Sequence, residues 1–181
     1  MNGQYTSIDD IKFANSYSNE DIAILFALFK DKIHDIIGYF QENAFARKMA
    51  LIMVKKTTLP AMFIKFISNP SIDETKLAIT RAERTSVFDI FKKSQHFSDK
   101  ALCDLVLKKV HPKDYVALCK CVSFTDSQDL LYLLNNACEW DICQLFSMIP
   151  HGDKQVRQCA LKLVPSNDLN SLTDCFQPTM F

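Results

Sequence analysis

The sequence of 181 residues has few glycines and prolines, three and six respectively, and a single tryptophan. So little turn chemistry excludes sandwiches and barrels built from many short strands. An excess of one charge is also missing, since 21 Lys and Arg stand against 21 Asp and Glu. This balance argues against a dedicated nucleic-acid or anionic-membrane binder. Because 48% of the residues are hydrophobic, a sizeable core is possible, and we predict an all-helical chain.

Targeting signals and long apolar runs are missing as well. Residues 1–10 have neither the positive segment nor the apolar segment of a secretory signal. The longest apolar run, residues 22–29, is far shorter than the roughly 20 residues that span a bilayer. Seven cysteines, an odd number, suit a reducing compartment better than an oxidising one. We therefore expect free thiols, no membrane span and a cytoplasmic location.

Internal repetition is the most informative feature that the sequence does have. Rows that begin at Asp99, Asp126 and Asp153, each 27 residues after the last, align without gaps. Four columns keep their character in every row: Leu107/Leu134/Leu161, Val110/Ala137/Val164, Asp114/Asp141/Asp168 and Leu118/Leu145/Leu172. Three apolar columns and one aspartate column, which recur in all three rows beside the aspartates that begin each row, predict a true structural repeat.

Each row reads as two short helices. Asp99, Asp126 and Asp153 fit N-caps of the first helix, where a carboxylate accepts an orphan backbone N–H. The predicted apolar face of the first helix comprises Leu105/Tyr132/Cys159, Val106/Leu133/Ala160 and Val110/Ala137/Val164. That of the second comprises Tyr115/Ile142/Leu169, Leu118/Leu145/Leu172, Cys121/Met148/Cys175 and Val122/Ile149/Phe176. The rows therefore predict pairs of amphipathic helices.

The pattern continues upstream in a looser form. Asp73, 26 residues before Asp99, resembles the start of an earlier row, with a second helix at residues 87–93. Residues 50–56 and 60–67 resemble a further pair, so about five helix pairs are expected between Asn43 and Phe176. A longer helix at about residues 19–37, begun by a capping box of Ser18 and Asp21 and ended by Gly38, is expected to precede them.

These elements predict one domain with the fold of a small α-solenoid. Residues 1–40 form an N-terminal extension and capping helix, 41–176 form helical repeats of about 27 residues, and 177–181 form a C-terminal tail. We expect a right-handed stack of about five short antiparallel helix pairs, closed at its open end by the capping helix.

One row carries a resemblance to a known family. The segment from Asp153 through Val156, Arg157 and Ala160 to Leu163 resembles the D-x-x-V-R-x-x-A-L-x-x-L helix of HEAT-like repeats, and its continuation to Leu172 is similar to leucine-rich-variant repeats. Only this row has the Val-Arg pair, and 27 residues are fewer than the roughly 40 of a HEAT unit. The resemblance implies helical architecture and a protein-binding scaffold, with nucleic acid as a less common ligand, and it implies no catalytic residues.

Several residues could in principle carry chemistry. Zinc is bound by imidazole and thiolate groups, and candidates for such ligands are His111, His151, Cys119, Cys121, Cys138 and Cys143. However, the repeat columns of Cys121, Cys159 and Cys175 also contain apolar residues, which favours a role for these thiols in the core. If His111 or His151 lay close to Cys138, the pair could act in nucleophilic catalysis, but the spacing of these residues does not indicate such a pair. Phosphate-binding glycine motifs are absent from the sequence. We therefore predict no catalytic residue, no metal and no cofactor.

The surface offers a clearer hypothesis. We predict a noncatalytic protein–protein interaction module whose partner is another protein, with nucleic-acid or phosphate binding as the alternative and an enzyme of unknown class third. For the alternative, Lys108, Asn135 and Lys162 would form a ridge facing phosphates. For the favoured function, Trp140 and Leu131 occupy columns that are otherwise polar, so both are expected to face outward as contact residues.

Overall fold

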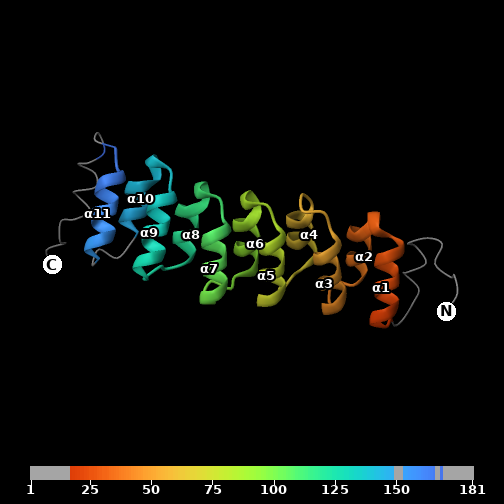
Figure 1. Cartoon of the computed structure of the whole chain (residues 1–181). Helices are drawn as coiled ribbons and strands as arrows, with labels where there is room; N and C mark the ends of the chain where they lie inside the picture. Colours follow the sequence, from red (N-terminus) through yellow and green to blue (C-terminus); the bar gives the residue numbers. More distant parts are fainter. Residues whose placement is uncertain (1–16, 149–152, 166–167, 169–181) are drawn as a thin grey trace. The chain divides into compact units, whose positions relative to one another are not determined.

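The computed structural model describes residues 17–148, 153–165 and 168. Over those residues the chain is all-helical and has no strand, as the composition predicts. The α-helices are α1 (Asn19–Leu28), α2 (Ile33–Tyr39), α3 (Ala44–Met53), α4 (Leu59–Phe66), α5 (Ile72–Arg81), α6 (Val87–Ser94), α7 (Lys100–Lys109), α8 (Tyr115–Cys121), α9 (Ser127–Asn136), α10 (Ile142–Ser147) and α11 (Lys154–Leu163) (Figure 1). Short 3-10 helices are η2 (Lys30–Lys32), η3 (Arg84–Ser86), η4 (Pro112–Asp114) and η5 (Glu139–Asp141).

The chain divides into two compact units, Met1–Gln95 and His96–Phe181. The first contains α1 to α6 and the second contains α7 to α11. In the part of the chain that the structure describes, no helix has the length and apolar character needed to cross a bilayer. The expectation of a single domain stays a prediction.

Within each unit the helices form two rows, in which each helix contacts the next but one along the chain. In the first unit α3 contacts α1 and α5, while α4 contacts α2 and α6 (Figure 1). In the second unit α9 contacts α7 and α11, while α10 contacts α8. Contacts such as α2 with α3, α5 with α6 and α10 with α11 join the two rows. Both units therefore bury their apolar side chains between two rows of short helices.

The first helix of each pair begins at a side-chain cap. Asp99 accepts a hydrogen bond from the backbone N–H of Leu102 at 2.7 Å, and Asp126 and Asp153 cap α9 and α11 in the same way. These are the three N-caps that the sequence predicts, because a carboxylate satisfies an orphan donor and favours the positive helix end. Ser18, Asn43 and Ser71 cap α1, α3 and α5.

The end of these helices recurs as well. Five of them run for ten residues and then enter extended backbone eleven residues after the N-cap, at Val54, Ala82, Val110, Ala137 and Val164. The 3-10 helices η3, η4 and η5 then lead directly into α6, α8 and α10. The second helix therefore starts in a fixed position relative to the first, and the residues of these turns are held by local backbone hydrogen bonds.

The predicted N-terminal helix is wrong in one respect, since residues 19–37 form two helices. The capping box of Ser18 and Asp21 is present, but the chain turns after Phe29, whose backbone φ is −115° and ψ is 48°. Gly38 lies inside α2 and does not stop it. The apolar spacing runs on through the turn, so periodicity does not reveal it. The turn places α1 against α3 and lets α2 contact both α3 and α4, which one straight helix would prevent.

The register of the upstream row also needs correction. Its N-cap is Ser71, 28 residues before Asp99, and Asp73 lies exposed in the first turn. Ser71 and Glu74 form a capping box in which Glu74 Oε2 accepts from the Ser71 N–H at 2.7 Å and Ser71 Oγ accepts from the Glu74 N–H at 3.2 Å. Two satisfied donors explain why the helix begins there.

Burial follows most of the predicted columns. Val106, Leu133 and Ala160 have no exposed surface, and Tyr115 and Leu118 are fully buried in α8. The column of Leu105, Tyr132 and Cys159 is only half-buried, contrary to its assignment to the apolar face. Leu161 is 41% exposed although its counterparts Leu107 and Leu134 are 1% exposed. The residues predicted to complete the last pair, Leu169, Leu172, Cys175 and Phe176, lie outside the described residues, as do 1–10 and 177–181.

Candidate interaction groove between α7 and α9

Three of the predicted contact residues line one groove on the second unit. Lys108 projects from the last turn of α7, and Leu131 and Asn135 lie one helical turn apart on α9. The groove has a volume of about 530 Å³, and Leu107, Gln128, Asp129 and Tyr132 complete its lining. Its surface therefore combines apolar, amide and charged groups, as protein-binding surfaces do.

Hydrogen bonds fix part of this lining. Asn135 Nδ2 donates to the backbone carbonyl of Leu131 at 2.8 Å. Its Oδ1 accepts from the Cys159 thiol of α11 at 3.6 Å. Both ends of the Asn135 amide are thus engaged within the protein, so its orientation is set before any ligand arrives.

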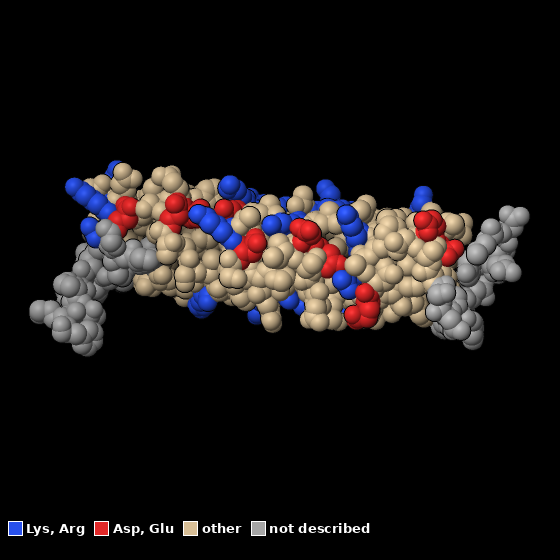
Figure 2. All heavy atoms as spheres, turned by 90° about the horizontal axis from the view of Figure 1, so that it is seen from below, with Lys and Arg blue, Asp and Glu red and all other residues tan. Residues whose placement is uncertain are grey.

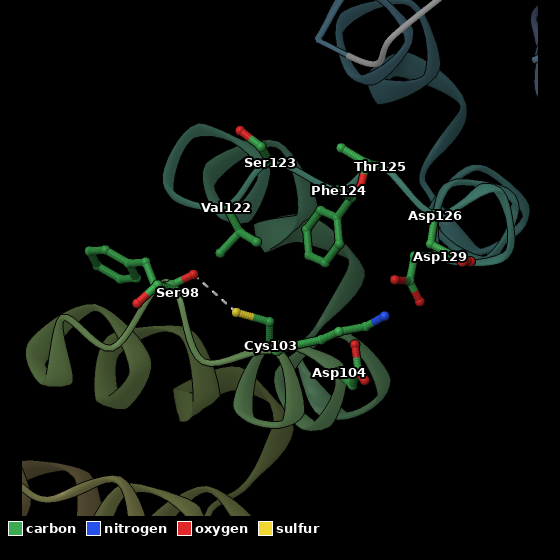
Figure 3. Close-up of a pocket in the computed structure, with 11 residues that line it drawn as sticks. Ser98, Cys103, Asp104, Val122, Ser123, Phe124, Thr125, Asp126 and Asp129 are labelled. Atoms are coloured by element: carbon green, nitrogen blue, oxygen red, sulfur yellow. Dashed lines mark hydrogen bonds between the residues drawn. The ribbon is translucent and has the colours of Figure 1, made fainter. Parts of the chain in front are cut away.

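A second hollow of about 360 Å³ adjoins the groove, because Asp129 lines both. In Figure 3, Val122 and Phe124 project from the segment after α8 toward Cys103 of α7, and Asp129 reaches across from α9 on the side of Asp104. We use the name α7–α9 groove for the two hollows together. It extends along both helices from the turn near Asp126 to Asn135.

The charges of the groove alternate in sign. Lys100, Asp104 and Lys108 stand at four-residue intervals along α7, and Asp126 and Asp129 face them from the start of α9. Burial raises the pKa of Asp129 above its usual value, and repulsion from Asp104 and Asp126 raises it further, while Lys100 and Lys108 oppose the rise. Acidic and basic neighbours therefore act on Asp129 in opposite directions.

The thiol in the groove belongs to Cys103 and is buried. Cys103 is 5% exposed, and its Sγ donates to the backbone carbonyl of Phe97 at 3.3 Å. Burial raises the pKa of this thiol to about 11, with further increases from Asp99 and Asp104. Burial also raises the pKa of Cys119 to about 11. At neutral pH both side chains are protonated, and the thiolate is the form that attacks substrates or binds metals.

The other histidine and cysteine candidates that the structure describes are not gathered into one site. His111 caps η4, since its Nδ1 accepts from the backbone N–H of Lys113 at 3.3 Å. His151 lies outside the described residues. In the described ranges, no three His, Cys, Asp or Glu side chains are grouped so that they could hold a metal ion. Cys121 and Cys159, assigned from their columns to the core, are only half-buried.

Two predicted contact residues lie apart from the α7–α9 groove. Trp140, the middle residue of η5, is 79% exposed, in agreement with its polar column. Lys162 is exposed near the end of α11 and is not part of the groove lining. Figure 2 shows acidic and basic side chains lying among one another on the face drawn, over both units.

Residues of two kinds were not predicted from the sequence. Tyr132 and Asp129 line the groove although the column of Tyr132 was assigned to the buried face. In the first unit, Arg47 joins α3 to α5 through a 2.7 Å ion pair between its Nε and Glu74 Oε1. A signal for Arg47 was present, because residues 47–51 have the same R-x-x-A-L pattern that begins at Arg157.

Comparisons with other proteins return no relatives: no protein-family model matches the chain, no curated protein matches it, and no solved structure matches it.

Proposed function

We propose that the chain is a noncatalytic protein-binding module, a small α-solenoid of helical repeats related in architecture to HEAT-like proteins, whose binding site is the α7–α9 groove. The observation that carries the proposal is the meeting of Lys108, Leu131 and Asn135 in one groove beside Tyr132. Recurrent N-caps and equal helix lengths support the repeat architecture. The chemistry of the groove supports binding over catalysis, because its thiol is buried and protonated.

A helical or extended peptide suits this groove better than a nucleic acid does. The half-buried side chains of Leu131 and Tyr132 offer apolar contact, and the charges beside them have both signs. A phosphate backbone approaching Lys108 also approaches Asp104 and Asp129, which lie close enough to influence one another. The six cysteines without disulfides in the described residues support the proposal of a reducing, cytoplasmic compartment.

A pair of matched variants tests the proposal. Leu131→Asp places a charge in the groove, and Gln158→Asp places the same charge at the equivalent position of α11, outside the groove lining. Both tagged variants and the wild type capture partners from lysate of cells that express the chain, and the captured partner is then titrated in purified form. We expect Leu131→Asp to weaken binding by about thirtyfold, the effect of losing a hot-spot contact of about 2 kcal/mol. Gln158→Asp should bind as the wild type does.

Two results would contradict the proposal. One is a partner whose affinity is the same for wild type and Leu131→Asp. The other is tight binding of RNA or DNA, measured by fluorescence anisotropy, with an affinity that falls steeply as salt increases. Circular dichroism of each variant verifies that the helices are intact.

A further inference from the structure

The turn η5 displays a tryptophan where the equivalent turns display polar residues. Trp140 is 79% exposed. The middle residues of η2, η3 and η4 are Asp31, Thr85 and Lys113, and all three are exposed and polar. The fold therefore does not require a large apolar side chain at this place. An indole kept in water on a surface position is costly, and tryptophan is the residue most enriched in binding hot spots.

The backbone under Trp140 is held firmly. The N–H of Asp141 donates to the Cys138 carbonyl at 2.9 Å, closing the 3-10 turn. Ile142, two residues after Trp140, is 2% exposed, and Leu145 is fully buried. The indole is thus presented from a fixed position, and binding a partner costs little backbone entropy there.

The charges next to the indole restrict what can bind it. Glu139 and Asp141 flank Trp140 in the same turn, and Glu139 is exposed. Two carboxylates repel the phosphates of nucleic acids and the headgroups of anionic lipids. A surface that accepts the indole and carries positive charge around it gains both apolar burial and charge complementarity.

We propose that Trp140 inserts into an apolar pocket of a partner protein whose rim carries Lys or Arg side chains that face Glu139 and Asp141. The inference rests on the proposed function, since it takes protein binding as given, but it assigns a second contact surface outside the α7–α9 groove. The partner site is therefore a cationic-rimmed pocket that accepts a single aromatic side chain.

The negative charge beside the indole is measured on the free protein, because Trp140 is the only tryptophan in the sequence. Fluorescence quenching by acrylamide, caesium and iodide ions is compared with quenching of N-acetyltryptophanamide. We expect efficient acrylamide quenching and a caesium-to-iodide ratio several times that of the free amide. Glu139→Gln with Asp141→Asn should return the ratio to that of the amide. A blue-shifted emission that acrylamide does not quench, or a ratio that favours iodide, overturns the proposal.

Photo-crosslinking in the full chain tests which partner surface Trp140 contacts. The photoreactive residue p-benzoylphenylalanine replaces Trp140, or in a matched control Lys113, the equivalent residue of η4. Irradiation in lysate of expressing cells should crosslink position 140, and not position 113, to a partner residue within an apolar pocket bordered by Lys or Arg. Glu139→Lys with Asp141→Lys should reduce the crosslink at least tenfold.

Each other outcome counts against the inference. The inference is overturned if position 140 gives no crosslink, or if it crosslinks to a second copy of the chain or to a surface without basic residues. It is also overturned if the charge reversal leaves the crosslink yield unchanged. The proposed function is tested apart from this by Leu131→Asp. If that variant loses the partner while changes at Trp140 have no effect, the groove assignment holds and the tryptophan assignment fails.

Discussion

Removal of Arg47 is expected to destabilise the first unit strongly. Its Nε lies 2.7 Å from Glu74 Oε1, and its Nη1 donates to the Gln41 carbonyl at 3.0 Å. The Arg47 and Glu74 side chains are 17% and 9% exposed. In Arg47→Ala the Glu74 carboxylate keeps only the Ser71 N–H as its bonded partner in this network. Breaking a buried ion pair costs about 3–5 kcal/mol, because one charge is left without compensation.

The partial exposure of Arg47 places the expected loss at the lower end of that range, about 3 kcal/mol. With a urea dependence of about 2 kcal/mol per molar, the unfolding midpoint falls by about 1.5 M. Glu74→Gln retains an oxygen that accepts hydrogen bonds and should cost about half as much. The double variant should show a coupling of at least about 1 kcal/mol between the two positions.

The assay is urea unfolding of the full chain followed by circular dichroism. Lys48→Ala is the matched control, since Lys48 is the exposed neighbour on the same helix and its loss should change stability by no more than about 0.5 kcal/mol. The reasoning is refuted if Arg47→Ala unfolds at the midpoint of Lys48→Ala, or if the effects of Arg47→Ala and Glu74→Gln are simply additive.

Two further perturbations probe a helix start and a thiol. Asn43→Ala should cost about 1 kcal/mol because the Asn43 side chain accepts from the Ala46 N–H at 2.9 Å, whereas Asn43→Asp should be at least as stable as the wild type; equal midpoints for both variants would contradict this. The pKa of Cys103 is raised to about 11, so its stabilising contribution is complete below about pH 8.5 and is lost as the pH rises toward 11. Iodoacetamide at pH 8 should label Cys103 about a hundredfold more slowly in the native than in the urea-unfolded chain, as mapped by mass spectrometry, and equal rates would refute the assignment.

Local chemistry made three of the helix starts predictable from sequence, although the start of α5 lies at Ser71 and not at Asp73. Asp99, Asp126 and Asp153 cap their helices because the capping interaction depends on residues within one turn. The break after Phe29 was not predictable in the same way, since the apolar spacing continues across it and packing of α2 against α3 and α4 decides it. Tertiary packing overrides periodicity at such positions.

The candidate site was predictable in part for the same reason. Exposure of Trp140 followed from the polar residues of its column. The meeting of Lys108 with Leu131 and Tyr132 in a groove depends on how far α7 and α9 stand apart, which no single row specifies. The columns predict which side chains lie on the same face of a helix. The depth of the groove between α7 and α9 depends on the side chains of both helices.

Packing between near neighbours in sequence governs how the chain should fold and open. The helices in close contact within each unit are at most two helices apart in the chain. Contacts of such short range close small loops, so folding should be fast and should not depend on the meeting of distant segments. The same locality makes stability uneven. Among the described helices, α11 packs chiefly against α9 and α10, and its Leu161 is 41% exposed where the counterparts in α7 and α9 are buried. We therefore expect α11 to exchange its amide protons before α9 does.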